Sequence, residues 1–216
     1  MELSGKTKVI GIFGCPIEHT LSPVMHNAAL NSLGLDMCYI AFKVLPQDLS
    51  GALQSVRALN MPGVNITVPH KENVIPLLDR VDEEALFIGA VNTIVNSEGK
   101  LTGYNTDGRG FMSSLSEHGI SHEGREIFIV GAGGASRAIS YYLSEKASKL
   151  TIFDINVSKM EKLVNDLRKI RGNIDFINRI EDIQNPHIII NATPLGLKPD
   201  DPLPLMPEVI TEDMLV

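Results

Sequence analysis

Residues 130–137 read Val-Gly-Ala-Gly-Gly-Ala-Ser-Arg, a glycine-rich turn that follows an apolar strand and opens a helix. Gly131 permits the tight turn, and Gly133 lets backbone N–H groups approach a pyrophosphate at the positive end of the helix. Ser136 takes the place of the usual third glycine and is still small enough for close helix–strand packing. The turn predicts dinucleotide binding, with a purely structural turn as the alternative. The candidate cofactor residues in it are Gly131, Ala132, Gly133, Gly134, Ala135 and Ser136.

An acidic residue, Asp154, ends the next predicted strand, 23 positions after Gly131. A carboxylate there accepts hydrogen bonds from the ribose hydroxyls of a dinucleotide and repels a 2′-phosphate. It therefore favours NAD over NADP, although a simple cap of the following helix is the alternative reading. Asn156 and Lys159 are further candidate cofactor residues, and Lys159 or Arg137 could reach a phosphate.

The turn belongs to the second of two strand–helix alternations, which together predict an α/β protein. In the second half we expect strands at 126–130, 149–154, 174–177 and 187–191, and helices at 107–118, 134–145 and 157–170. This is the layout of a doubly wound nucleotide-binding half. In the first half we expect strands at 8–14, 39–44 and 64–68, helices at 22–34, 46–59, 69–78 and 82–88, and an edge hairpin at 90–105.

We therefore predict two domains: a βαβ substrate-binding domain with a mainly parallel sheet at 1–105, and a Rossmann-like NAD(P)-binding domain at 106–216. Residues 206–216 show no closing helix, so we expect the second domain to be incomplete at its C-terminus and the chain to be a piece of a longer protein.

Composition narrows the class of protein. Of the 216 residues, 44% are hydrophobic and 21% charged, enough for a packed core. A net charge of −7 argues against a nucleic-acid partner, and no run suits a signal peptide or a membrane span. The two cysteines form no CxxC pair, so we expect a cytoplasmic protein.

Polar side chains gather after the predicted strands of the first half, in the clusters 19–22, 65–71, 92–93 and 105–107. Ligands of open α/β sheets bind at such strand ends. These hydroxyls, amides, one ammonium and one carboxylate suit a polyhydroxylated acidic small molecule. The histidines and Cys15 show no paired metal-ligand spacing, so we expect no metal.

Lys71 is the most informative residue of these clusters. Placed in the first turn of the helix predicted at 69–78, its charge opposes the helix dipole by about 0.3–1 kcal/mol, which favours proton transfer near neutral pH. A solvated surface lysine is the alternative. Asp107 precedes a glycine at a helix start, so an N-cap is its alternative role.

Six stretches in this order resemble the shikimate dehydrogenase family, from Val9 to about Gly196: 14–23 (GCPIEHTLSP), 65–71 (NITVPHK), 89–93 (GAVNT), 105–108 (NTDG), 131–136 (GAGGAS) and 191–194 (NATP). The resemblance implies a reversible NAD(P)-dependent reduction of 3-dehydroshikimate to shikimate, a step in chorismate and aromatic amino acid biosynthesis. It implies that Lys71 and Asp107 are the catalytic pair. Substrate binding is implied for Thr20, Ser22, Thr67, Lys71, Asn92 and Asp107, and a place beside the nicotinamide for Asn191, Ala192 and Thr193.

Three departures from the family pattern stand out. Thr20 replaces the usual serine, the run Asp154-Ile155-Asn156 lacks the arginine of NADP-dependent members, and the family's C-terminal segment with a Tyr and a Gln near the substrate is missing. Two alternatives stay open: a quinate/shikimate dehydrogenase that prefers NAD, and a non-catalytic homologue that binds nucleotide or substrate. Homodimer formation is also left open.

Overall fold

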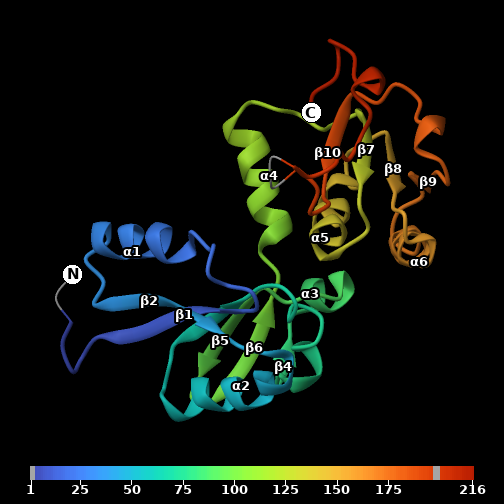
Figure 1. The fold of residues 1–216 in the computed structure, drawn as a ribbon. Helices are drawn as coiled ribbons and strands as arrows, with labels where there is room; N and C mark the ends of the chain where they lie inside the picture. The colour runs from blue at the N-terminus through green and yellow to red at the C-terminus, as the bar shows by residue number, and fades with distance from the viewer. Residues whose placement is uncertain (1–2, 197–199) are drawn as a thin grey trace. The chain divides into compact units, whose positions relative to one another are not determined.

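The computed structural model describes residues 3–196 and 200–216. The chain divides into two compact units, Met1–Thr106 and Asp107–Val216, each with its own sheet (Figure 1). In the described part of the chain, no helix is both long and apolar enough to cross a bilayer.

The first unit is built on a six-stranded sheet with the order β2-β1-β3-β5-β6-β4. Its strands are β1 (Lys8–Gly14), β2 (Met37–Lys43), β3 (Gly63–Ile66), β4 (Arg80–Val81), β5 (Thr93–Ser97) and β6 (Lys100–Tyr104). β1 runs parallel to β2 and β3, and β4 to β6, whereas β5 is antiparallel to β3 and β6. The predicted α/β class is confirmed: three of the five strand pairs in this sheet are parallel, and the sheet is mixed because β5 runs antiparallel to both of its neighbours. The hairpin also does not form the edge, which belongs to the two-residue strand β4.

Three helices accompany this sheet: α1 (Ser22–Ser32), α2 (Leu49–Ala58) and α3 (Glu83–Ile88). The alternation of β1 divides its side chains between two cores. Ile12 joins Leu30 of α1, and Phe13 joins Leu53 of α2. The sheet thus carries α1 and α2 on opposite faces.

The helix predicted at 69–78 is not formed. The segment is a series of turns ending in the 3-10 helix Ile75–Leu77, with one i→i+4 bond from the Val74 N–H to the His70 carbonyl (2.9 Å). Pro69 and Pro76 both lack an N–H, so a continuous helical ladder cannot be completed here.

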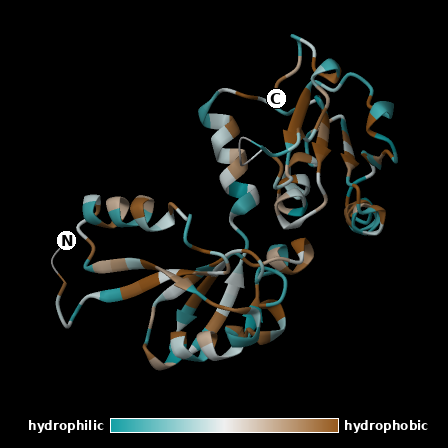
Figure 2. Cartoon of the chain, in the orientation of Figure 1, coloured by the Kyte–Doolittle hydropathy of each residue, from teal (hydrophilic) through white to brown (hydrophobic). Residues whose placement is uncertain are grey.

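The second unit is a four-stranded parallel sheet with the order β10-β7-β8-β9. Its strands are β7 (Glu126–Val130), β8 (Lys149–Phe153), β9 (Ile174–Phe176) and β10 (Ile188–Asn191), and its helices are α4 (Asp107–Glu117), α5 (Gly134–Leu143) and α6 (Val157–Arg168). Hydrophobic residues line these strands, as Figure 2 shows. From β7 the chain builds outward to β8 and β9, then returns to β10 on the other side of β7. Such a switch point is where open α/β sheets bind ligands.

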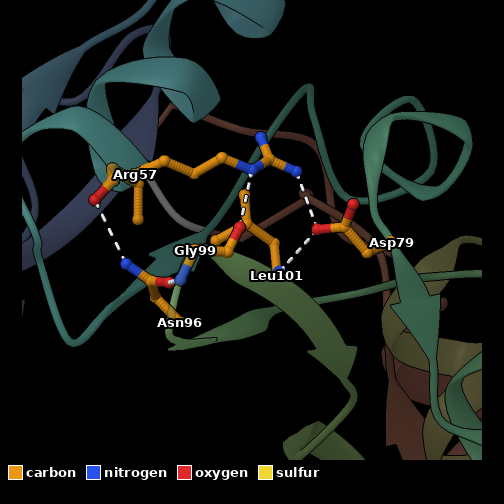
Figure 3. A network of polar contacts seen from close by, with 6 residues as sticks. Arg57, Asp79, Asn96, Gly99 and Leu101 are labelled. Atoms are coloured by element: carbon orange, nitrogen blue, oxygen red, sulfur yellow. Dashed lines mark hydrogen bonds and ion pairs between the residues drawn. The ribbon is translucent and has the colours of Figure 1, made fainter.

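A separate polar network ties α2 to the β5–β6 turn (Figure 3). Arg57 donates to the Gly99 carbonyl (2.9 Å) and to the Asp79 carboxylate (2.8 Å), which also accepts from the Leu101 N–H (2.7 Å). Asn96 caps the turn by accepting from the Gly99 N–H (2.9 Å). This network explains the position of Arg57 and Asp79 without any ligand.

Candidate active site

Two of the predicted polar clusters lie at adjoining strand ends of the first unit. The Cys15 N–H donates to the Val68 carbonyl (3.0 Å), and the Thr67 N–H donates to the Phe13 carbonyl (3.0 Å). The Cys15–Pro16 and Val68–Pro69 peptide bonds are both cis. The two hydrogen bonds hold the loops after β1 and β3 against each other, which brings Thr67 to the same edge as the loop that carries Thr20.

Thr20 and Ser22 form a hydroxyl pair at the start of α1. The Thr20 hydroxyl donates to the Ser22 hydroxyl (3.1 Å), and the Ser22 N–H donates to Thr20 Oγ1 (3.3 Å). Both residues are half-buried. Two adjacent hydroxyls that already share a hydrogen bond can turn their donors to an incoming carboxylate.

Lys71 lies in a turn, so the helix dipole expected to act on its charge is not there. Its carbonyl accepts from the Val91 N–H (2.8 Å), which fixes its backbone beside the residue that precedes Asn92. The buried Asn92 accepts the Thr106 N–H on Oδ1 (3.0 Å) and donates to Thr106 Oγ1 (3.0 Å). Asp107 follows Thr106 directly and is the first residue of α4.

An ion pair braces the loop that carries Thr20. Lys43 Nζ lies 3.1 Å from Glu18 Oε1, and the Ile17 N–H donates to Glu18 Oε2 (3.0 Å). Hydrogen bonds from the Glu18 and Ile17 backbone N–H groups, followed by the Lys43 ammonium, lower the pKa of Glu18 from 4.5 to about 2.

We expect Glu18 to stay ionised down to about pH 3. Because its pKa is lower in the folded state, its contribution to stability is complete above pH 4.5 and is lost as the pH falls toward 2. Lys43→Gln should raise the pKa of Glu18 only partly, since the backbone bonds remain. Carboxyl-carbon NMR titration measures both values, and a wild-type midpoint near 4.5 would contradict the assignment.

In the second unit the glycine turn lies at the carboxyl end of β7. Gly131 has φ +109°, and its N–H donates to the Phe153 carbonyl (2.7 Å). The Ala132 N–H donates to Asp154 Oδ2 (2.6 Å), and the Asn156 N–H donates to Asp154 Oδ1 (2.7 Å). Asp154 is thus fixed against the turn, with lone pairs left for further donors.

A cavity of about 410 Å³ adjoins this turn, lined by Gly131, Gly133, Asp154, Asn156, Lys159 and Thr193 among others. A Cβ built on Gly133 would meet nothing within 4 Å, so the backbone is open to a ligand at the N-terminus of α5. These residues fit a dinucleotide: open backbone donors for a pyrophosphate and a carboxylate for a ribose.

The remaining candidate cofactor residues have different contacts in the structure, and only some of them line the cavity. Arg137 donates to Asp166 of α6 (2.9 Å), which joins two helices, whereas Lys159 lines the cavity. Ser136 is fully buried, where its small size serves helix packing. Asn191 shapes its own loop, accepting from Thr193 N–H (3.0 Å) and donating to the Leu195 carbonyl (2.9 Å).

Gly131→Ala is expected to destabilise the protein by about 1–3 kcal/mol, because its backbone is left-handed and the new Cβ would lie 2.8 Å from the Ala192 carbonyl oxygen. Gly133→Ala is the matched control: its Cβ enters open space, so stability should change by less than about 0.5 kcal/mol. Denaturant unfolding measures both. Equal losses in the two variants would contradict this account of the turn.

One polar residue of the first unit, Tyr39, lies outside the polar clusters identified in the sequence. Tyr39 on β2 donates to Asn65 Oδ1 on β3 (2.7 Å), and Asn65 Nδ2 donates to Thr93 Oγ1 (3.1 Å). The available signal was a tyrosine alternating with Met37 and Ala41 on one face of its strand. Among residues 3–196 and 200–216, no group of three or more His, Cys, Asp or Glu side chains could hold a metal ion.

The two sheets and the glycine turn at the switch point define an α/β protein of the nucleotide-binding class. The sequence profile of the shikimate dehydrogenase substrate binding domain matches residues 12–94. The NADP(+) shikimate dehydrogenase of Desulforamulus reducens is 41% identical over 99% of this chain and 77% of its own length. The crystal structure of the Aquifex aeolicus shikimate dehydrogenase is similar with a TM-score of 0.92 at 37% identity, over 99% of this chain and 79% of that one. For the Listeria monocytogenes shikimate 5-dehydrogenase in complex with shikimate and NAD, the TM-score is 0.89 at 36% identity, over 99% and 78%. The chain belongs to the shikimate dehydrogenase family.

Proposed function

We propose that this protein catalyses the reversible NAD(P)-dependent reduction of 3-dehydroshikimate to shikimate. The observation that carries the proposal is that backbone hydrogen bonds fix Thr67, Lys71 and Asn92 in the loops that follow the strands of the first unit. The chain also belongs to the shikimate dehydrogenase family. In this proposal residues 1–105 bind the substrate and residues 106–216 bind the cofactor. Homodimer formation stays a prediction.

Each proposed role follows from side-chain chemistry. The bound nicotinamide supplies or accepts the hydride. In reduction, the substrate oxygen gains charge and takes a proton from the Lys71 ammonium, while the Asp107 carboxylate orients Lys71 and balances its charge. The Thr20 and Ser22 hydroxyls bind the substrate carboxylate, and Thr67 and Asn92 bind its hydroxyls.

For the cofactor we propose a preference for NAD. Asp154 lies at the cavity with both oxygens fixed, so a 2′-phosphate would approach a carboxylate. Ile155, 92% exposed, offers no compensating cation. Lys159 lines the same cavity, so NADP is disfavoured rather than excluded.

Steady-state oxidation of shikimate and of quinate, each with NAD and with NADP, tests the proposal. The expected result is a clearly higher kcat/KM for shikimate, with NAD the better cofactor. A higher kcat/KM for quinate would favour the quinate dehydrogenase alternative. Cofactor binding without turnover of either substrate would contradict the enzymatic function and favour a binding protein.

A further inference from the structure

We propose that Tyr39 is a positioning residue for the substrate site, whose buried hydroxyl orients the side-chain amides of Asn65 and Asn92. This inference rests on the proposed function for its kinetic consequence, but its structural part can be measured without turnover. The site residues assigned from the sequence do not include Tyr39 or explain why its hydroxyl is buried.

Tyr39 is held in one place by three sets of contacts. Its side chain is 3% exposed, and its ring stacks on His26 of α1 at 4.2 Å between centroids. The Asn27 side-chain amide binds both the N–H and the carbonyl of Tyr39 at 2.9 Å. Its hydroxyl donates to Asn65 Oδ1 at 2.7 Å. The hydroxyl therefore has little freedom to choose another partner.

The Tyr39 hydroxyl acts as a donor. Burial raises the pKa of Tyr39 to about 12, so the phenol keeps its proton at neutral pH. Because Tyr39 donates to Asn65 Oδ1 (2.7 Å) and Asn65 Nδ2 donates to Thr93 Oγ1 (3.1 Å), the donors run in one direction from Tyr39 through Asn65 to Thr93. Hydrogen bonds aligned in this way strengthen one another.

The direction of this chain decides how the two amides lie. With Oδ1 of Asn65 taken by Tyr39, its NH₂ must face Thr93 Oγ1 (3.1 Å), and the Thr93 hydroxyl then donates to Asn92 Oδ1 (2.9 Å). Asn92 Oδ1 also receives the Thr106 N–H (3.0 Å), and the Asn92 NH₂ donates to Thr106 Oγ1 (3.0 Å). The amide of Asn92 is thereby held in one orientation in the proposed substrate site.

The test is Tyr39→Phe, which keeps the ring stacked on His26 and removes only the donor. We expect the KM for shikimate to rise about five- to tenfold, with kcat changed less than about twofold and the cofactor KM unchanged. Asp79→Asn, which weakens the network of Figure 3 in the same unit, is the control for a general loss of stability and should leave this KM unchanged. An unchanged KM in Tyr39→Phe, or an equal rise in Asp79→Asn, would overturn the inference.

A double-mutant cycle and a ¹⁵N NMR spectrum test whether Tyr39 acts by positioning Asn92. If Tyr39 acts through Asn92, Tyr39→Phe should add little to the KM change of Asn92→Ala, and additive effects would contradict this. The Asn92 side-chain NH₂ signals in the ¹⁵N NMR spectrum should shift in Tyr39→Phe but not in Asp79→Asn. Should Tyr39→Phe not fold, Asn65→Ser should give the same KM rise and NMR shift.

The NMR measurement of the Asn92 side-chain signals does not depend on enzymatic activity. Absence of shikimate oxidation by the wild-type protein contradicts the proposed function alone. Unmoved Asn92 signals in a folded Tyr39→Phe protein contradict the inference alone.

Discussion

Lys71→Ala is expected to lower kcat for shikimate oxidation by about 10²- to 10⁴-fold, the usual contribution of a general acid–base group. The turn around Lys71 is fixed through backbone atoms, namely the Lys71 carbonyl with the Val91 N–H and the His70 N–H with the Thr67 carbonyl. Removal of the side chain should therefore leave the loop in place. Steady-state kinetics together with cofactor binding measure the effect, and cofactor affinity should be nearly unchanged.

Asp107→Ala should show a similar loss of kcat, and the double variant should lose little more than either single variant, because the two residues act as a unit. Lys71→Arg is the matched variant, since it keeps the positive charge but gives up a proton far less readily. Near-normal kcat in Lys71→Ala or in Lys71→Arg would contradict the assigned proton transfer.

Asp154→Asn combined with Ile155→Arg is expected to move the ratio of kcat/KM for NADP over NAD upward by about 10²-fold or more. Two like charges about 4 Å apart repel by about 4 kcal/mol at an effective dielectric near 20, before salt weakens the repulsion. The double change removes that repulsion and adds a cation that can bind a phosphate through two hydrogen bonds. Because Ile155 is 92% exposed, the arginine requires no repacking.

The control for this change is Ile155→Gln, which adds a long polar side chain without charge and should leave the preference nearly unchanged. Ile155→Arg alone should show a smaller shift, because Asp154 remains, held by the Ala132 and Asn156 N–H groups. A wild-type protein that favours NADP tenfold or more would contradict the NAD preference. That outcome would assign Lys159, at the same cavity, to the 2′-phosphate.

The helices and strands of the second unit agree closely with those predicted from its sequence. Strand Glu126–Val130 and the helix beginning at Gly134 form as predicted, because an apolar run, a glycine turn and a helical pattern all agree there. The helix expected after Pro69 did not form, since the apolar pattern suited a helix but the prolines remove donors that a helix needs. The antiparallel pairing of β5 with β3 was also missed, because alternation predicts a strand but not the direction of its neighbour.

The candidate site was likewise predicted only in part from the sequence. The glycine turn and Asp154 were found because they follow a local motif, and the structure joins them through the Ala132 N–H. Tyr39 and its link to Asn65 were missed because this hydrogen bond joins residues 26 positions apart, on strands that are not direct neighbours in the sheet. Such pairs depend on tertiary structure, and local sequence carries no sign of them.

Hydride transfer from the substrate carbon is the central claim, and isotopic labelling tests it most directly. Shikimate deuterated at the carbon that bears the oxidised hydroxyl would be turned over with NAD, and the reduced cofactor analysed by proton NMR and mass spectrometry. The account predicts deuterium at C4 of the reduced nicotinamide. Reduced cofactor without deuterium, or no reduction at all, would contradict the account.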